Sequence, residues 1–419
     1  MKNLLPIAEV TSFSPPTTSL DSDTLAQAAR IVSQVKTGGD ASLRACIQEY
    51  ESREAETLVL GPDELKAAAE RCDRTTLELL KRTAARIRAF ADAQKACLTG
   101  LETPIPGGVA GHNLSPVQSA ACYAPGGRFP LPSSVLMTAI TARQAGVRNV
   151  WVVTPSSDDI MLAAAFIAEA DGLVWAGGAH AIAGVAWGTQ TLPAVDMIVG
   201  PGNRWVTAAK QLVSGQVGID MLAGPSELLV MADETANPSL VAADLVAQAE
   251  HDPDAVPILV TTSNEVVEGV QAALIEILKS VDTADIARQS LGNGASIVCN
   301  NWAEAIETVN HLGPEHLEVQ VAEPRPIIEK LNNYGALFIG SGAAEVLGDY
   351  GAGPNHVLPT SGTSRYRGGL SVFDFLRIRT WMRIDSPSDA SCLYNDAEDL
   401  AGLEGLSGHG LSARLRSQS

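Results

Sequence analysis

The chain has 419 residues, of which 46% are hydrophobic and 18% are charged, and its formal net charge is −19 at pH 7. Such a composition predicts a well-packed globular protein of two or more domains. The excess of acidic residues argues against nucleic acid and anionic membranes as partners, because both attract local clusters of Lys and Arg.

The cysteines and the N-terminus indicate the compartment in which the protein works. Six cysteines are scattered without a CxxC pair, which favours free thiols in a reducing compartment and gives no support to a cysteine metal site. The first ten residues lack the long apolar core and the cleavage site of a secretory signal. No run approaches the ~18 apolar residues of a membrane span. We therefore expect a cytoplasmic globular protein.

Helical patterns dominate the first part of the chain, at residues 23–36, 62–72 and 75–94. From Ser133 onward, short apolar strands alternate with helices. We predict these strands at residues 149–155, 173–178, 195–202, 226–233, 257–262, 296–300 and 335–340. This alternation is typical of parallel, doubly wound sheets, whose ligands bind beyond the carboxyl ends of the strands.

The predicted fold class is α/β, with two doubly wound Rossmann-like domains, a helical N-terminal part and a small C-terminal segment. Residues 1–20 are expected to form an N-terminal segment. Residues 21–120 together with residues 229–365 are expected to form a first, discontinuous α/β domain. Residues 121–228 are expected to form a second α/β domain, and residues 366–419 a C-terminal segment.

The stretch from Asn237 to Asp254 predicts a mostly buried helix that carries a stripe of polar residues. Asp244, Gln248 and His251 recur at i, i+4 and i+7, so they share one side of the helix. A buried hydrogen-bond network would satisfy these side chains. A metal ion would also satisfy them, since imidazole, amide oxygen and carboxylate without thiolate suit Zn²⁺ or Mn²⁺. The helix alone leaves both interpretations open.

Three further histidines lie near carboxylates in the sequence: His316 in "GPEHLE", His356 in "GDYGAGPNHVLPT" and His409 in "EGLSGHG". In an irregular turn, Glu315 and His316 can project into one site as proton donor and acceptor. At the start of a helix, Glu315 would merely favour the positive end of the helix dipole. Glycines around Asp349 and His356 would let the backbone approach a ligand closely.

The glycine-rich loops do not complete a nucleotide-binding motif. "GDYGAGPNH" lacks the Gly-Lys-Ser/Thr ending of a P-loop, so a nucleoside triphosphate is not expected. Neither "GPGNRW" nor "YAPGGRFPLPSS", which contains Gly126 and Gly127, completes GxGxxG. The residues taken alone therefore predict a metal-assisted α/β enzyme with several histidines and acidic residues.

Taken together, these motifs resemble those of the histidinol dehydrogenase family. The segments "YAPGG…LPSSVLM", "GPGN…VTAAK", "IDMLAGPSELLVMAD", "QAEHDPDA", "GPEHLE", "GDYGAGPNHVLPT" and "EGLSGH" occur in the family's order and at similar spacing. The resemblance runs from about Gly38 to the C-terminus and is dense between Tyr123 and Thr360. It covers most of the chain, so it implies the family's fold as well as its chemistry.

The resemblance implies one Zn²⁺ per subunit. The positions that match the family's zinc ligands are Gln248, His251, Asp349 and His409. We add Asp244 as an expected outer partner of these ligands. The resemblance also implies a homodimer in which the C-terminal segment, residues 366–419, completes the site of the other subunit. His409 and Glu404 would then come from the neighbouring chain.

Members of the family oxidise L-histidinol through an aldehyde to L-histidine with two NAD⁺ in succession, in histidine biosynthesis. By this resemblance, Glu315 and His316 are the acid–base residues. Positions that match substrate contacts are Ser226, Gln248, His251, His316, Asp349, His356, Glu404 and His409. Positions that match cofactor contacts are Tyr123, His180 and Asn203, which puts residues 121–228 on the cofactor side.

The chain departs from the usual family pattern at two places. His180 stands where the family usually has Gln beside the cofactor, and Arg367 and Gly368 alter a loop of the C-terminal part. Arg367 is either a surface residue or a recognition site for an anionic substrate, because guanidinium groups suit carboxylate or sulfonate. Three hypotheses follow: a histidinol dehydrogenase, a paralogous zinc- and NAD-dependent dehydrogenase of another small polar alcohol such as a sulfonated diol, and a zinc hydrolase or non-catalytic zinc subunit.

Overall fold

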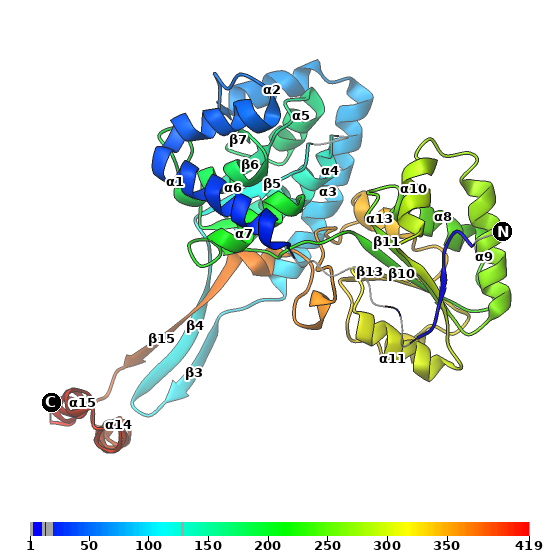
Figure 1. The fold of residues 1–419 in the computed structure, drawn as a ribbon. Helices are drawn as coiled ribbons and strands as arrows, with labels where there is room; N and C mark the ends of the chain where they lie inside the picture. The colour runs from blue at the N-terminus through cyan, green and yellow to red at the C-terminus, as the bar shows by residue number, and fades with distance from the viewer. Residues whose placement is uncertain (1–2, 11–12, 14–19, 127–129, 419) are drawn as a thin grey trace.

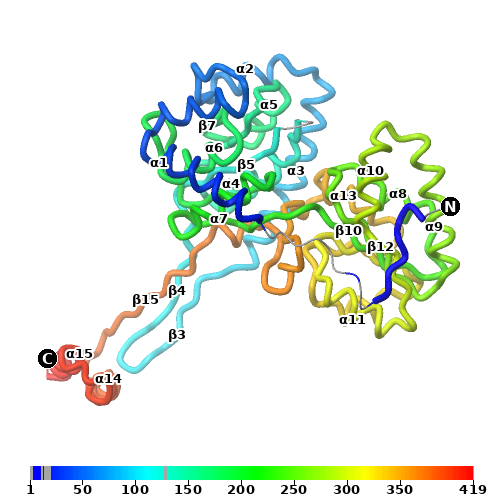
Figure 2. The backbone as a smooth tube through the Cα atoms, viewed as in Figure 1, coloured from blue at the N-terminus to red at the C-terminus, as the bar shows by residue number. Residues whose placement is uncertain are grey.

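The computed structural model describes residues 3–10, 13, 20–126 and 130–418. Its chain forms two α/β lobes and a long arm that projects away from the first lobe (Figure 1). The N-terminus lies on the second lobe and the C-terminus lies at the tip of the arm, as the tube in Figure 2 also shows. Gly127 of the glycine-rich loop lies outside the described residues.

The first lobe is built on a six-stranded sheet of order β2-β7-β6-β5-β8-β9, in which only β2 runs antiparallel to its neighbour. Its strands are β2 (Val59–Leu60), β5 (Ser119–Tyr123), β6 (Asn149–Thr154), β7 (Gly172–Trp175), β8 (Met197–Val199) and β9 (Gly218–Ile219). Its helices are α1 (Ser22–Glu51), α2 (Pro62–Arg71), α3 (Arg74–Ala96), α4 (Pro132–Ala145), α5 (Asp159–Ile167), α6 (Gly178–Trp187) and α7 (Arg204–Val213).

The second lobe is built on a six-stranded sheet of order β1-β12-β11-β10-β13-β14, in which all pairs are parallel. Its strands are β1 (Ile7–Ala8), β10 (Glu227–Ala232), β11 (Val256–Thr261), β12 (Ala295–Val298), β13 (His316–Gln320) and β14 (Ala336–Ile339). Its helices are α8 (Pro238–Ala249), α9 (Asn264–Ile277), α10 (Ala284–Leu291), α11 (Trp302–Leu312), α12 (Arg325–Ile328) and α13 (Glu345–Asp349).

The arm is an antiparallel sheet of order β15-β4-β3 that carries two helices at its tip (Figure 1). Its strands are β3 (Leu101–Ile105), β4 (Gly108–Pro116) and β15 (Leu376–Ile384), and its helices are α14 (Ser391–Leu403) and α15 (Ser407–Ser417). The 3-10 helices η1 (Thr363–Arg365) and η2 (Val372–Phe375) precede β15. Val372 and Phe375 of η2 are buried in the core of the first lobe, so they anchor the base of the arm.

The parallel α/β topology of both lobes confirms the predicted fold class. The predicted domain boundaries need correction, however. Helices α1 to α3 bury residues such as Ile47, Leu65 and Ile87 mainly against the strands of residues 119–199, and from residues 229–365 these two described cores include Val357 alone. The N-terminal segment also differs from the prediction, since β1 pairs with β12 at the edge of the second sheet.

Local sequence features explain where the elements begin. Asp21 and Asp73 cap α1 and α3 by accepting hydrogen bonds from the backbone N–H groups of Thr24 and Thr76, as expected for N-cap aspartates. The strands of the two central sheets are rich in Val, Leu, Ile and Ala and are mostly buried on both faces, as parallel strands require. Among the described residues, every helix falls short of the length and apolar character needed to cross a bilayer.

Candidate functional site

The predicted catalytic and metal residues gather at one edge of the second sheet. Strand β10 begins at Glu227 and β13 begins at His316, and parallel strands have their amino ends at the same edge. Helix α8 follows the carboxyl end of β10 and returns to this edge, where it ends at Ala249. The predicted site residues of the second lobe thus lie at the amino ends of its strands, and not at the carboxyl ends, where ligands of open α/β sheets usually bind.

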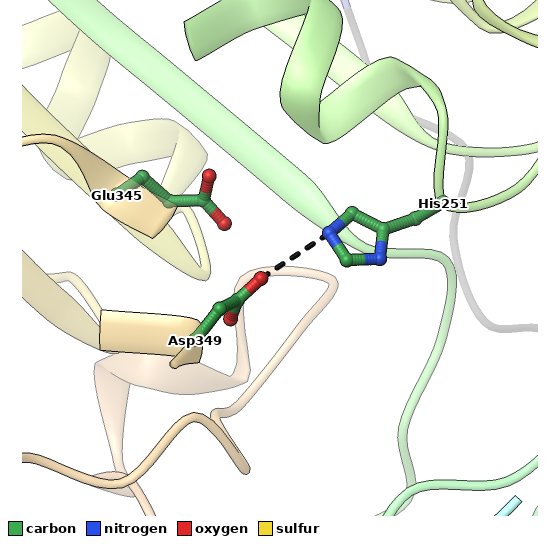
Figure 3. Close-up of side chains that lie close together, drawn as sticks. All are labelled: His251, Glu345 and Asp349. Carbon is green, nitrogen blue, oxygen red and sulfur yellow. Dashed lines mark ion pairs between the residues drawn. The ribbon is translucent and has the colours of Figure 1, made fainter. Parts of the chain in front are cut away.

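His251, Glu345 and Asp349 form a compact group in which one potential ligand atom from each residue lies within 4.8 Å of the others. Figure 3 shows the imidazole of His251 and the carboxylate of Asp349 pointing toward each other, with the carboxylate of Glu345 beside them. Nε2 of His251 lies 3.2 Å from Oδ2 of Asp349. His251 follows the end of α8 and is not on the helix itself, which corrects part of the predicted stripe.

Electrostatics within this group favour binding of a cation. The hydrogen bond with Asp349 raises the pKa of His251, against the effect of burial. Burial opposes ionisation of Asp349, but its hydrogen bond with His251 and the nearby rings of His316 and His356 lower its pKa to about 2. Asp349 is therefore a carboxylate at neutral pH, as a metal ligand must be.

Gln248 provides an independent sign that a group is bound here. Its side chain is fully buried at the end of α8, yet neither its amide oxygen nor its amide nitrogen has a hydrogen-bond partner among the described residues. Buried amides are normally hydrogen-bonded, because desolvation without a partner is costly. A metal ion bound by Gln248, His251 and Asp349 would satisfy the oxygen. The nitrogen and oxygen donors of these three residues fit Zn²⁺.

Glu345 was missed by the sequence analysis, although it lies four residues before Asp349 and so on the same side of α13. It is completely buried, and neither of its carboxylate oxygens has a hydrogen-bond partner in the described part of the chain. Burial, together with the negative charge of Asp349, raises the pKa of Glu345 to about 9. The group is therefore protonated at neutral pH unless a cation lies beside it.

Among the described residues, Asp244 makes no hydrogen bond with Gln248, and its hydrogen bond runs elsewhere than to the predicted ligands. Its carboxylate accepts a hydrogen bond from the side-chain amide of Gln320 at 3.3 Å, and that amide also donates to Glu318 at 3.1 Å. Burial raises the pKa of Asp244. The polar stripe of α8 is therefore divided, since Asp244 belongs to a buried hydrogen-bond network and the side chain of Gln248 has no hydrogen-bond partner among the described residues.

The predicted acid–base pair is buried beside this group. Nε2 of His316 lies 3.8 Å from Glu345 and 3.9 Å from Asp349, while Nδ1 lies 3.6 Å from Glu315. Glu315 lies in the bend that immediately precedes β13, and His316 is the first residue of that strand, so the helix interpretation of "GPEHLE" is wrong. The two side chains come together at this bend, as the turn interpretation predicted.

Burial sets the protonation of the pair. It lowers the pKa of His316, so the imidazole stays neutral at physiological pH. It raises the pKa of Glu315 well above the usual value, and the neighbouring carboxylates Glu227, Asp349 and Glu345 add to this effect. A neutral imidazole can accept a proton, and a carboxylate whose pKa is raised is a stronger base than an exposed carboxylate.

His356 connects the site to the first lobe. Its Nδ1 lies 3.0 Å from the main-chain oxygen of Asp349, and its Nε2 lies 3.2 Å from the hydroxyl of Ser134 on α4. Since a carbonyl oxygen can only accept, Nδ1 carries the proton. Ser226 is half-buried immediately before β10, and its carbonyl accepts a hydrogen bond from Val256. Both predicted substrate residues therefore lie at the same edge as the metal residues.

Glu404 and His409 lie elsewhere. They are exposed on the C-terminal helices at the tip of the arm, which Figure 1 shows far from α8 and α13. They line a small pocket between α14 and α15, of about 330 Å³. Within one chain, the structure thus brings His251 and Asp349 together and buries Gln248 at the end of α8, whereas His409 lies on the arm.

The predicted cofactor residues lie at the carboxyl edge of the first sheet. The hydroxyl of Tyr123 accepts a hydrogen bond from the N–H of Gly178 at 3.2 Å, and the side chain of Asn203 caps α7. His180 is buried, and its Nε2 lies 2.8 Å from Glu51, a partner that the sequence analysis did not identify. Glycine loops at this edge are the usual place for a nucleotide in such sheets.

Arg367 is already engaged by the protein itself. Its guanidinium donates to the carbonyl of Ile219 at 3.1 Å and lies 3.7 Å from Asp374. These contacts attach the loop before η2 to the end of β9. They favour a structural role for Arg367 over recognition of an anionic substrate.

Comparison with known proteins shows which family the chain resembles. The family model for histidinol dehydrogenase matches residues 16–417. Histidinol dehydrogenase from Pseudomonas fluorescens (strain Pf0-1) is 43% identical over 394 residues, which cover 92% of this chain and 89% of that protein. The enzyme of the same name from Methylococcus capsulatus is 40% identical over 406 residues, covering 95% and 93%.

A crystal structure of histidinol dehydrogenase from Elizabethkingia anophelis superposes with a TM-score of 0.92 at 29% identity, covering 100% of this chain and 99% of that one. The match therefore includes both lobes and the arm. With a family model over nearly the whole chain, relatives above 40% identity and a clustered set of histidines and carboxylates, the chain belongs to the histidinol dehydrogenase family of oxidoreductases.

Proposed function

We propose that the protein oxidises L-histidinol through the aldehyde to L-histidine, with two NAD⁺ and one Zn²⁺ per subunit. The observation that carries this proposal is the contact between the candidate metal group, His251 and Asp349, and the buried acid–base pair, Glu315 and His316. Buried histidine and carboxylates with shifted pKa values are expected where proton transfer takes place.

Gln248, His251 and Asp349 would hold the zinc, with His409 of a second copy of this chain as a further ligand. Bound zinc would orient a substrate that carries an imidazole and an amine, through nitrogen coordination. Asp349 lies 3.9 Å from Nε2 of His316. A substrate bound at a zinc ion that Asp349 helps to hold would therefore have its reacting hydroxyl close to this imidazole.

The first oxidation removes a hydride from carbon and a proton from the hydroxyl of the substrate. Nδ1 of His316 lies 3.1 Å from the carbonyl of Glu227, which can only accept, so Nε2 is the free base. We assign to this Nε2 the removal of the hydroxyl proton. When bound at the carboxyl edge of the first sheet, NAD⁺ would accept the hydride.

The second oxidation requires water to add to the aldehyde carbon before another hydride leaves. Glu315 is buried and its pKa is well above the usual value, so it is a stronger base than an exposed carboxylate. We assign to Glu315 the removal of the proton from this water. The products of the two steps are one carboxylate and two NADH, with the released protons passing to the protein and then to solvent.

The arm supports a dimer with shared sites. Its outer surface exposes large apolar side chains that a lone chain would leave in water, among them Ile378, Met382, Leu403, Leu411 and Leu415. Exposed apolar patches of this kind mark protein interfaces. We propose that the arm reaches across a two-fold axis, so that Glu404 and His409 enter the site of the partner.

Mixing two inactive variants tests this sharing. Neither Glu315→Gln nor His409→Ala is expected to form an active homodimer. In a heterodimer, one site combines an intact Glu315 with an intact His409 from the other subunit. A 1:1 mixture, exchanged under mild denaturant, should therefore recover activity in about a quarter of the sites. No recovery, with heterodimers demonstrated by differential tagging, would show that each site is built from one chain.

The assay that tests the chemical proposal is NAD⁺ reduction by the zinc-loaded protein on addition of L-histidinol. A small sulfonated diol serves as the comparison, since it would suit an anionic-substrate paralogue. Because the guanidinium of Arg367 is engaged by Ile219 and Asp374, we expect reduction with L-histidinol and not with the diol. The reverse preference would assign the site to another small alcohol.

A further inference from the structure

Glu227 is a buried carboxyl at the first residue of β10 that has no role in the chemistry described so far. Each of its polar groups contacts the acid–base pair or the loop beside it. Its backbone N–H donates to the carboxylate of Glu315 at 2.9 Å, and its own carboxylate accepts from the N–H of Glu315 at 3.3 Å. The two glutamates are therefore joined by reciprocal hydrogen bonds.

The remaining groups of Glu227 extend this connection. The second oxygen of its carboxylate accepts from the N–H of Ser361 at 2.8 Å, which ties the segment after His356 to the same point. Its carbonyl oxygen accepts from Nδ1 of His316 at 3.1 Å. One residue thus links two neighbouring strands, a loop and both members of the acid–base pair.

We propose that Glu227 is a positioning residue for the acid–base pair. The carboxylate of Glu227 holds the main chain of Glu315 and the Ser361 loop. The Glu315 carboxyl and the His316 imidazole thereby keep their positions relative to the substrate. The inference rests on the proposed function. It assigns Glu227 no contact with the substrate or the metal.

The negative charge of Glu227 also affects the pKa of Glu315. Glu315 faces Glu227 of β10, His316 of its own strand, and Asp349 and Glu345 of α13. The negative charge of Glu227 raises the pKa of Glu315, in addition to the larger effect of burial. Burial likewise raises the pKa of Glu227 itself to about 7. Removal of the Glu227 charge should therefore lower the pKa of Glu315.

Two variants separate position from charge. In Glu227→Gln the charge is lost and one of the two main-chain N–H groups faces an amide nitrogen, which cannot accept. In Glu227→Asp the charge remains, but the shorter side chain cannot reach both N–H groups. Both should reduce kcat, by roughly 10- to 100-fold, because small displacements of a catalytic group are costly. The KM for L-histidinol should change little, since Glu227 does not bind it.

The pH profile provides a measurement that a purely structural role would not move. A base acts only when deprotonated, so a lower pKa of Glu315 extends activity to lower pH. The acidic limb of kcat should move to lower pH in Glu227→Gln and stay in place in Glu227→Asp. Asp196→Asn is the control. The carboxylate of Asp196 also accepts hydrogen bonds from main-chain N–H groups, those of Gln118 and Ser119, but it does so at the start of β5 in the first sheet.

Three outcomes would count against a positioning role for Glu227. Wild-type kcat in folded, zinc-containing Glu227→Gln and Glu227→Asp would overturn the inference. So would an equal loss of kcat in Asp196→Asn, because the effect would then be one of general stability. If Glu227→Gln does not fold, an unchanged kcat in Glu227→Asp decides against it. Failure of the proposed function is distinct, since the unmodified protein would then not reduce NAD⁺ with L-histidinol.

Discussion

Replacing His316 with asparagine is expected to lower kcat by about 10²- to 10⁴-fold, the usual contribution of a general acid–base group. The imidazole is buried, and its Nε2 is the free base beside Asp349 and Glu345. Asparagine can still donate a hydrogen bond to the carbonyl of Glu227, so the local fold should persist. Steady-state kinetics with L-histidinol and NAD⁺ measure the effect, and the zinc content should equal that of the unmodified protein.

His311→Asn is the matched control for this experiment. His311 is exposed near the end of α11 and belongs to neither the metal group nor the acid–base pair, so its replacement should leave kcat unchanged. Wild-type turnover in His316→Asn would contradict the acid–base assignment. Loss of zinc together with turnover would instead point to a structural role for His316.

Replacing His251 with alanine is expected to abolish tight metal binding. His251 supplies the imidazole nitrogen that lies 3.2 Å from Asp349, and without it Gln248 and Asp349 are the only predicted ligands left within the subunit. Removal of a direct ligand should cost more than the roughly 10- to 100-fold in affinity that loss of an outer partner costs. Zinc content after dialysis, by atomic emission, measures this, with circular dichroism to verify the fold.

The control is His311→Ala, which should retain its zinc. Stoichiometric zinc in dialysed His251→Ala would contradict the ligand assignment. Added zinc should restore little activity to the variant, because the site lacks a nitrogen donor whatever the metal concentration in the assay.

The alternation of strands and helices after Ser133 could be predicted from the sequence because it is a local property. Each buried parallel strand is a short run of apolar residues, and each helix has its own cap and period. Strand β13 was not predicted from the sequence. Its sequence "HLEVQ" alternates polar and apolar residues, and Glu318 and Gln320 are nevertheless buried in a shared network.

The domain boundaries could not be predicted because they depend on contacts between distant parts of the chain. Strand β15 pairs with β4 across more than 200 residues, from Leu376–Pro116 to Ile384–Gly108. Likewise, the N-terminal helices α1 to α3 are amphipathic and would suit either sheet. The sheet against which these helices pack depends on the shapes of the apolar surfaces that meet in the folded chain. The sequence of one helix does not contain this information.

The site could be predicted only in part, because it also depends on contacts between distant parts of the chain. Gln248 and His251 lie close in sequence, so they could be grouped from the sequence, although His251 lies just beyond the end of α8. Their approach to Asp349 depends on how α13 packs beside α8, and sequence reasoning reached it only through the family resemblance. Glu227 lies within a family motif and Glu345 lies just before another, but the sequence assigned a role to neither. Their importance comes from burial and from contacts with Glu315 and Asp349, which only the folded chain provides.

The measurement that tests the central claim most directly is the yield of NADH per L-histidinol, with limiting substrate and excess NAD⁺, together with identification of the product. The assignment of His316 to the first oxidation and Glu315 to the second predicts two NADH and one L-histidine for each L-histidinol consumed. One NADH per substrate with release of an aldehyde, or no NADH from folded, zinc-loaded protein, would contradict it.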